Sequence, residues 1–257
     1  MSSKYASHSF APWSGDIDMR SNKLTWVLSA LIAGGALTFS FDRVNAHGDV
    51  APQAVDTSEL PDIGEEWLEE NPWRDPNTPE WAAAIRIGAS GYNQNCARCH
   101  GLEVISGGLA PDLRYLEANI DGDEWYLERY QVGYTQNGIT KMPAFGELLG
   151  QKAAWAIRTY IETRPGDGAL DDYTGRLKEI RDTIKGMAES GKSAADAESE
   201  IAPLRTEMDE IAKSIETSSE APVADSAASR AVALLDGSDD SLKNAAEALT
   251  IGLSAAQ

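Results

Sequence analysis

The sequence predicts an all-α protein, in which a compact helical domain is followed by a C-terminal helical hairpin and two further short helices. Two observations predict this class. Apolar residues recur at intervals of three and four over several segments, which is the spacing of one face of an α-helix. The two cysteines of the chain form a C-x-x-C-H motif without a surrounding β-α-β pattern. We expect four regions, at residues 1–46, 47–77, 78–165 and 166–257.

The motif Cys96-Ala97-Arg98-Cys99-His100 is the attachment signature of a c-type haem. Each thiol bonds one vinyl group of the porphyrin, and the histidine then serves as an axial ligand of the iron. A structural zinc site needs four nitrogen or sulfur ligands, and outside the motif only His8 and His47 could contribute. A thioredoxin-like redox pair belongs near a β-α-β pattern. The sequence therefore predicts one covalently bound haem c, held by Cys96, Cys99 and His100.

The sixth ligand of the iron is sought among the remaining histidines and methionines. Most of these lie in the N-terminal segment or on apolar faces of predicted helices, which leaves His47 and Met142. Met142 precedes Pro143, which disfavours helical geometry at Met142 and places it in an extended loop. The alternative is that Met142 is a flexible core filler. We predict His100 and Met142 as the axial pair, which leaves no open iron site and suits electron transfer.

Residues 19–46 have the features of an export signal. A basic start from Met19 to Lys23 is followed by an uncharged apolar stretch at 24–41 and by the small residue Ala46 at a cleavage-like end. We expect translation to start at Met19, cleavage to follow Ala46, and the mature protein to be periplasmic. The alternative is an uncleaved anchor, because the apolar stretch is close to the length of a short membrane span.

The charge of the chain limits its partners. The formal net charge is -19, whereas nucleic acids and anionic membrane surfaces attract positive patches. We expect no nucleic-acid partner, and membrane contact only through an uncleaved signal, if at all.

The segment 47–77 is rich in proline and acidic residues and contains Trp67 and Trp73. Such a composition predicts an extended arm laid over the core of the protein. His47 would become the terminal residue after cleavage, and we assign it no role.

Three helices are predicted within residues 78–165. The first begins after Thr78, where a hydroxyl cap, Pro79 and an acidic first turn are the expected start signals. Its apolar face includes Gly88, which would allow another helix to approach closely. The second is expected at about 123–132, with Asp121 or Asp123 as its cap, and the third at about 148–162. Three helices around a C-x-x-C-H motif and a Met-Pro loop predict a class I cytochrome c domain.

The region 166–257 shows two apolar seams, at 173–187 and 201–215, with spacings of three and four. The polar stretch between them predicts an antiparallel hairpin whose seams face each other. Two shorter helices are expected at about 226–235 and 242–253, with Ser241 as the cap of the last. The Asp-rich connector at 236–240 lacks the twelve-residue pattern of a calcium loop.

Pro111 lies after a glycine-containing loop. Its carbonyl could accept a hydrogen bond from the free ring nitrogen of His100 and so fix the tautomer of the ring. The alternative is that Pro111 only turns the chain.

Four motifs carry a more specific resemblance, at 95–101, 107–114, 141–146 and 155–158. They resemble the cytochrome c-550 group, which serves periplasmic alcohol dehydrogenases containing pyrroloquinoline quinone (PQQ). The resemblance implies that Cys96, Cys99, His100 and Met142 match the haem cysteines, proximal histidine and loop methionine of that group. It adds Pro111 and Arg114 as candidate cofactor-binding residues. The helical tail ending at 249–253 is also similar to that group.

The resemblance implies an electron-transfer protein rather than an enzyme. Its donor would be a PQQ-dependent alcohol dehydrogenase, and its acceptor a downstream oxidase or cytochrome. Three alternatives remain open: a cytochrome c for another periplasmic dehydrogenase, a haem enzyme or gas sensor with an open distal site, and an interaction module whose helical tail is the functional surface.

Overall fold

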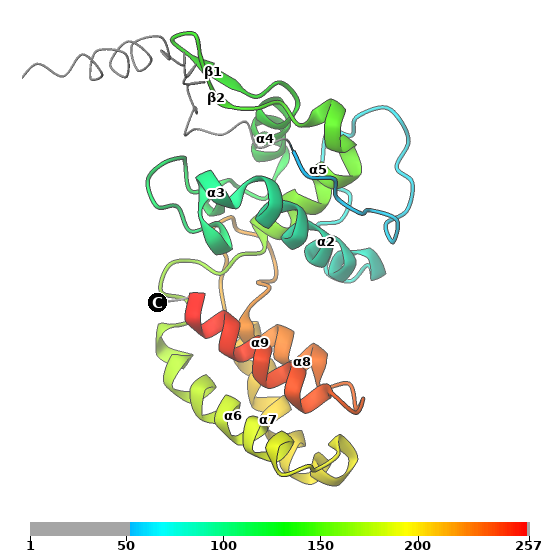
Figure 1. Ribbon diagram of the computed structural model, residues 1–257, viewed down its shortest axis with the longest axis vertical. Coiled ribbons are helices and arrows are strands. Elements are labelled where there is room, and N and C mark those ends of the chain that lie inside the picture. The colour runs from blue at the N-terminus through cyan, green and yellow to red at the C-terminus, as the bar shows by residue number, and fades with distance from the viewer. Residues whose placement is uncertain (1–51, 256–257) are drawn as a thin grey trace, which may run out of the picture. The chain divides into compact units, whose positions relative to one another are not determined.

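The computed structural model describes residues 52–255 (Figure 1). The export signal, the alternative membrane anchor and His47 lie outside these residues. The described helices gather around two apolar cores, a first core of residues between 60 and 161 and a second core of residues between 170 and 253. The all-α class is confirmed, with one short β-hairpin added to it.

The first core is built on the crossing of helices α2 (Pro79–Asn95) and α5 (Gly146–Glu162), which lie against each other in Figure 1. A Cβ atom on Gly88 would lie 1.9 Å from the carbonyl oxygen of Ala156, so a larger residue could not occupy the crossing without moving a helix. The rings of Tyr92 and Tyr160 meet beside it, with centroids 5.4 Å apart. The sequence-based role of Gly88 is therefore present in the fold.

The starts of two helices differ from the predictions. Helix α4 (Ile120–Val132) is capped by Asn119, whose side-chain oxygen accepts a hydrogen bond from the amide of Gly122 at 2.9 Å. The predicted caps Asp121 and Asp123 are wrong, because both lie inside the helix and Asp123 is buried among ion pairs. Thr78 does precede α2, but its hydroxyl donates to the carbonyl of Asp75 instead of capping the helix.

A β-hairpin separates α4 from α5. Its strands β1 (Tyr134–Gln136) and β2 (Ile139–Met142) are antiparallel, and Asn137 and Gly138 at the turn have φ values of 53° and 74°. Positive φ at both central residues is the requirement of a type I′ turn, for which Asn-Gly is the favoured pair. Met142 is the last residue of β2, so the extended geometry predicted for it takes the form of a strand.

The described part of the arm, residues 52–77, packs against α5. Leu60 and Trp73 are buried in the first core. The side chains of Gln151 and Lys152 donate hydrogen bonds to the arm carbonyls of Glu66, at 2.9 Å, and of Leu60, at 2.6 Å. These carbonyls of the extended arm would have no hydrogen-bond partner in the arm itself, and the side chains of α5 supply one.

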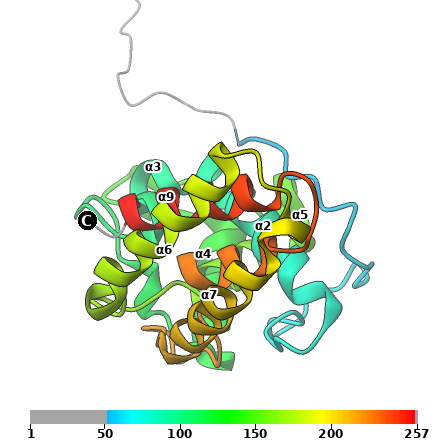
Figure 2. The same ribbon diagram turned by 90° about the horizontal axis from the view of Figure 1, so that it is seen from below.

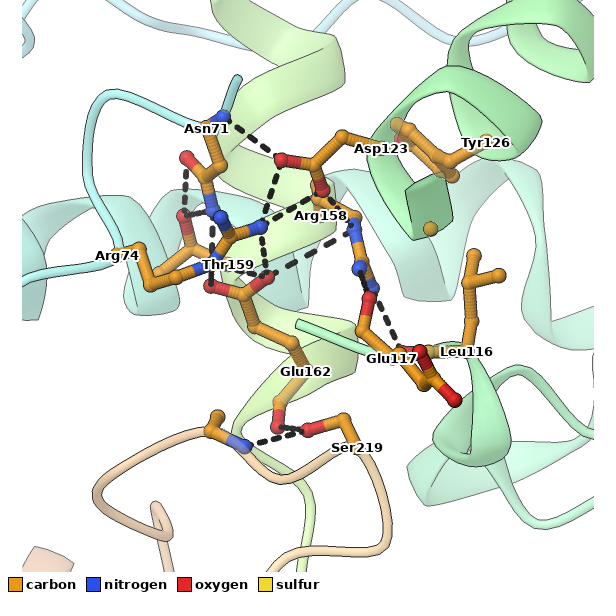
Figure 3. A network of polar contacts seen from close by, with 12 residues as sticks. Asn71, Arg74, Leu116, Glu117, Asp123, Tyr126, Arg158, Thr159, Glu162 and Ser219 are labelled. Atoms are coloured by element: carbon orange, nitrogen blue, oxygen red, sulfur yellow. Dashed lines mark hydrogen bonds and ion pairs between the residues drawn. The ribbon is translucent and has the colours of Figure 1, made fainter. Parts of the chain in front are cut away.

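A buried network of charges ties the arm to α4 and α5 (Figure 3). Asp123 lies 2.6 Å from Nη2 of Arg74 and accepts a hydrogen bond from Nε of Arg158 at 2.8 Å. Glu162 lies 3.1 Å from Nη2 of Arg74. Burial raises the pKa of Glu162 although both arginines act to lower it. Removing one member would leave a buried charge without its partner, which is strongly destabilising.

The second core is formed by four helices: α6 (Asp171–Glu189), α7 (Ala194–Ser214), α8 (Ala227–Leu234) and α9 (Ser241–Ala255). Both predicted seams are buried in this core. They do not simply face each other, because α9 covers α6 and α8, and α7 packs mainly on α8 (Figures 1 and 2). The two helices of the predicted hairpin, α6 and α7, are thus part of a cluster of four helices.

The caps of the short helices also differ in part from expectation. Ser226 caps α8, where its hydroxyl and that of Ser229 form a reciprocal capping box. Ser241, the predicted cap of α9, is instead the first residue of that helix, and its buried hydroxyl has no hydrogen-bond partner among the described residues. The prediction of Ser241 as a cap is wrong.

Four charged residues join the two cores, and we call them the Arg164 cluster: Glu103, Arg164, Asp225 and Arg230. Arg164 follows α5 and is 1% exposed, and it pairs with Asp225 and, at 2.8 Å, with Glu103. Arg230 of α8 pairs with Asp225 at 2.8 Å. The amide of Asp225 also donates to the carbonyl of Thr163 at 2.8 Å. The segment before α8 is therefore held to the end of α5.

The helix crossing gives the first prediction. We expect Gly88→Ala to lower the free energy of unfolding by at least about 1–3 kcal/mol, because the added methyl group overpacks the contact with Ala156. The matched control is Gly175→Ala in α6, where a Cβ atom meets open space and helix propensity favours alanine by up to ~1 kcal/mol. Urea unfolding measures both. Equal stability of Gly88→Ala and wild type would contradict the close crossing.

Acid should weaken the ion pairs of the Arg164 cluster, which connect the two cores. Burial would raise the pKa of Asp225, but Arg164 and Arg230 hold it below its ordinary value of 3.8. A carboxylate whose pKa is lowered in the fold stabilises that fold above its ordinary pKa, and this contribution is lost as the pH falls through the folded-state pKa. Asp225→Asn should therefore cost stability at about pH 7, and this cost should shrink as the pH falls below 3.8 toward the lowered folded-state pKa.

Unfolding curves of wild type and Asp225→Asn over this pH range test the expectation. Asp182→Asn is the control, because Asp182 is exposed and pairs only with its neighbour Arg181 among the described ion pairs. A stability gap of the same size in acid and at neutral pH would show that Asp225 does not act through its charge.

Candidate haem site

The two cysteines lie on one short helical turn. Cys96 ends α2, where its amide donates to the carbonyl of Tyr92 at 2.7 Å, and it precedes α3 (Ala97–His100). The amide of His100 donates back to the carbonyl of Cys96 at 3.0 Å, which closes the turn. Neither cysteine is in a disulfide, so both sulfur atoms are available to bond the porphyrin.

The ring of His100 is fixed by the backbone of Pro111. Its Nδ1 atom lies 2.9 Å from the carbonyl oxygen of Pro111. A carbonyl can only accept a hydrogen bond, so Nδ1 carries the proton and Nε2 keeps the lone pair that can bind a metal. The contact that the sequence suggested for Pro111 is therefore present. Burial lowers the pKa of His100, which favours the neutral ring that such binding needs.

A tight turn follows His100, and we call residues 101–105 the Gly101 turn. It contains the 3-10 helix η1 (Leu102–Val104). Gly101 has a φ of +86°, and a Cβ atom there would lie 1.8 Å from the carbonyl oxygen of Ile105. The hydroxyl of Tyr92 donates to the carbonyl of Gly101 at 2.9 Å. The sequence pattern does not single out Tyr92, and its position four residues before Cys96 is the signal that could indicate this contact.

Arg114 belongs to the 3-10 helix η2 (Leu113–Tyr115) and makes two ion pairs. Its Nη2 atom lies 2.7 Å from Asp112 and 2.7 Å from Asp167, a residue that follows α5. Burial would raise the pKa of Asp112, but hydrogen bonds from Arg114 and the Ser106 amide hold it below the usual value. The structure thus adds Asp167, which the sequence did not single out, to the surroundings of Arg114. A direct role of Arg114 in cofactor binding stays a prediction.

Met142 is partly buried and packs against the first core. It pairs with Tyr134 across the hairpin, and a Cβ atom on Gly133 would lie 2.4 Å from its carbonyl oxygen. Because Gly133 has no Cβ atom, the backbone before β1 can lie against the backbone of Met142. The donor set formed by two free thiols, an imidazole with an available Nε2 and a thioether fits a covalently attached haem. The specific roles of these residues stay predictions.

Comparison with known proteins identifies the family. Residues 83–161 match the family model for subunit III of cbb3-type cytochrome c oxidase. The chain is 50% identical to cytochrome c550 of Pseudomonas aeruginosa over 137 residues, which cover 53% of this chain and 93% of that protein. This chain belongs to the cytochrome c family.

Two further relatives of this cytochrome are larger enzymes. It is 31% identical over 96 residues to the quinohemoprotein alcohol dehydrogenase ADH IIB of Pseudomonas putida, and 32% identical over 85 residues to ADH-IIG of the same organism. These matches cover 37% and 33% of this cytochrome but only 12% and 11% of the enzymes. No solved structure shows a significant match.

This cytochrome binds haem c covalently and is an electron-transfer protein. Among residues 52–255, none of the helices combines the length and apolar character needed to cross a membrane. Within the same range, no group of three or more His, Cys, Asp and Glu side chains could hold a metal ion.

The proposed distal ligand gives a test of the axial pair. We expect Met142→Ala to keep the covalent haem but to open the sixth position of the iron, so that the reduced variant binds carbon monoxide while the wild type does not. Absorption spectra with and without carbon monoxide measure this. Met208→Leu, a volume-conserving change in the second core, is the control and should leave the spectra unchanged. Wild-type ligand spectra in Met142→Ala would remove Met142 from this role.

Proposed function

We propose that this cytochrome is a periplasmic one-electron carrier that accepts electrons from a PQQ-dependent alcohol dehydrogenase and passes them toward a terminal oxidase or another cytochrome. The observation that carries electron transfer is the covalent attachment turn with its fixed histidine, in which Pro111 holds Nδ1 of His100 at 2.9 Å. Together with Met142, His100 would leave the iron without an open position.

The choice of donor rests on the relatives. Two of them are named quinohemoprotein alcohol dehydrogenases, and this cytochrome matches only 12% and 11% of their length. A segment similar to this cytochrome is thus one part of those enzymes. We infer that here the alcohol-oxidising part is a separate protein, to which the cytochrome must dock for each transfer.

Haem supplies an iron that can change its charge by one unit without making or breaking a covalent bond. The chain contributes the rest: Cys96 and Cys99 would hold the group, while His100 and Met142 would set its preference for the reduced state. A quinol in the donor gives up two electrons, so each turnover would reduce two molecules of the cytochrome. Substrate chemistry stays in the dehydrogenase.

Docking would use the apolar side chains next to the attachment turn. Leu102 and Leu109 follow His100 closely in the chain and are 73% and 77% exposed. Exposed leucines cost little desolvation when a partner covers them, which suits a contact that must form and separate in each cycle. We propose that this face receives the dehydrogenase.

The periplasmic location rests on the predicted export signal at 19–46 and on the likeness to cytochrome c550. Covalent attachment through a C-x-x-C-H motif is consistent with export, because this attachment normally takes place outside the cytoplasmic membrane. Sequencing the N-terminus of the protein recovered from the periplasm would test cleavage after Ala46.

Stopped-flow mixing tests the donor. We expect the ferric cytochrome to be reduced rapidly and saturably by a periplasmic PQQ-dependent alcohol dehydrogenase, and only when both enzyme and alcohol are present. Dithionite reduction is the control that the haem is competent. A haem that dithionite reduces but the dehydrogenase does not would refute this donor and leave a cytochrome c for another dehydrogenase.

The docking face is tested in the same assay. Leu109→Asp should lower the second-order rate of reduction by about tenfold, which corresponds to about 1.4 kcal/mol. The control is Ile251→Asp on α9, which changes an apolar side chain that is 55% exposed on the second core and should leave the rate unchanged. If the rate of reduction falls equally in both variants, the surface around Leu102 and Leu109 is not the docking site.

A further inference from the structure

The Gly101 turn contains a strained stretch of backbone. Glu103 and Val104 have φ values of 52° and 66°. Left-handed backbone is uncommon for residues other than glycine, and for a β-branched residue such as valine it is an outlier. Each such residue persists only where its surroundings hold it. The strain lies three and four residues after His100.

Two different parts of the chain hold this turn. The side chain of Val104 is fully buried in the first core. The carboxylate of Glu103 accepts a hydrogen bond from Nη1 of Arg164 at 2.8 Å and lies 3.6 Å from Nη2 of Arg230. Arg230 belongs to α8, so the second core contributes directly to the position of the turn.

Asp225 organises these two arginines. It pairs with Arg164 and accepts hydrogen bonds from Nε and Nη2 of Arg230, at 2.9 Å and 2.8 Å. The guanidinium group of Arg164 also lies over the ring of Tyr160, 4.2 Å from its centroid. Arg164 and Arg230 thus approach Glu103 from fixed directions, because each has a second partner within the fold.

The turn connects these charges to His100 over a short length of chain. Only Gly101 and Leu102 separate His100 from Glu103. The carbonyl of Gly101 accepts a hydrogen bond from the hydroxyl of Tyr92 at 2.9 Å. A shift of Glu103 would therefore be transmitted to the residue that directly follows the proposed axial ligand. Association of the two cores alone would need the pairing of Arg164 with Asp225, but no contact with Glu103.

We propose that Asp225 and Arg230 are positioning residues for the haem: acting through Arg164 and Glu103, they hold the Gly101 turn and with it the orientation of His100. The C-terminal helices would thereby keep the axial bond of His100 to the iron closed. The inference rests on the proposed ligand role of His100, but it is independent of the identity of the electron donor.

The test uses the holoprotein with Arg230→Gln and Asp225→Asn, one variant of each charge. We expect faster amide hydrogen exchange at residues 101–105 in both, and an increase of about tenfold in the rate at which imidazole enters the ferric haem in both. Arg230→Lys should restore part of the protection. Arg176→Gln is the matched control, because Arg176 is an exposed arginine of the second core that also pairs with two carboxylates, Glu179 and Glu207.

Arg230→Gln removes a positive charge and Asp225→Asn a negative one. Comparing the two variants therefore separates a positioning role from a long-range electrostatic effect on the haem. A long-range effect of charge would shift the midpoint potential in opposite directions in the two variants and leave both exchange and imidazole entry unchanged, which would overturn the proposal. Faster exchange at 101–105 without faster imidazole entry would also overturn it, because the turn would then be held without consequence for the haem.

A further variant guards against a general loss of structure. Glu103→Gln leaves the pairs of Asp225 with Arg164 and Arg230 intact but weakens the contact with the turn. It should reproduce the faster exchange and imidazole entry with little loss of global stability. Wild-type behaviour of Glu103→Gln would refute the proposal. None of these measurements uses an alcohol dehydrogenase, so a wrong donor would not affect them.

Discussion

The close contact of α2 with the backbone of α5 at Gly88 determines where the attachment turn lies. Because no side chain separates Gly88 from Ala156, the tyrosine one helical turn later, Tyr92, reaches across to Tyr160. The hydroxyl of Tyr92 then holds the carbonyl of Gly101, directly after His100. Gly88 thus allows the contact between Tyr92 and Tyr160, and Tyr92 in turn holds the backbone next to His100, the proposed axial ligand.

Buried charges reinforce the apolar packing that connects the parts of this chain. The arm is tied down through Asp123 and Glu162, and the second core through Asp225. Buried ion pairs contribute little net stability compared with well-packed apolar residues, but they are costly to break one partner at a time. The segment before α8 also contacts the end of α5 directly, where the hydroxyl of Ser219 donates to the carbonyl of Glu162 (Figure 3).

Local patterns were sufficient to predict most of the helices and the attachment motif, and they suggested the contact between Pro111 and His100 without excluding a simple turn at Pro111. Those features depend on spacing along the chain, which a sequence shows directly. The caps were less predictable, because an aspartate near a helix start can serve either as a cap or as a buried ion-pair partner. Asp123 is such a case, since its arginines come from 49 and 35 residues away in sequence. The Arg164 cluster was not predicted for the same reason.

The length of the cytochrome can be understood from this arrangement. Cytochrome c550 of Pseudomonas aeruginosa matches 53% of this chain, so a large part of the chain has no counterpart in that relative. An independent appended module would need only a linker and its own core. Here Arg230 of α8 instead lies 3.6 Å from Glu103, a strained residue of the Gly101 turn. Strain held by a distant segment makes the site depend on the whole chain, because the turn relaxes if that segment moves. If Asp225 and Arg230 position the Gly101 turn as proposed, the second core acts as part of the haem site rather than as a separate domain.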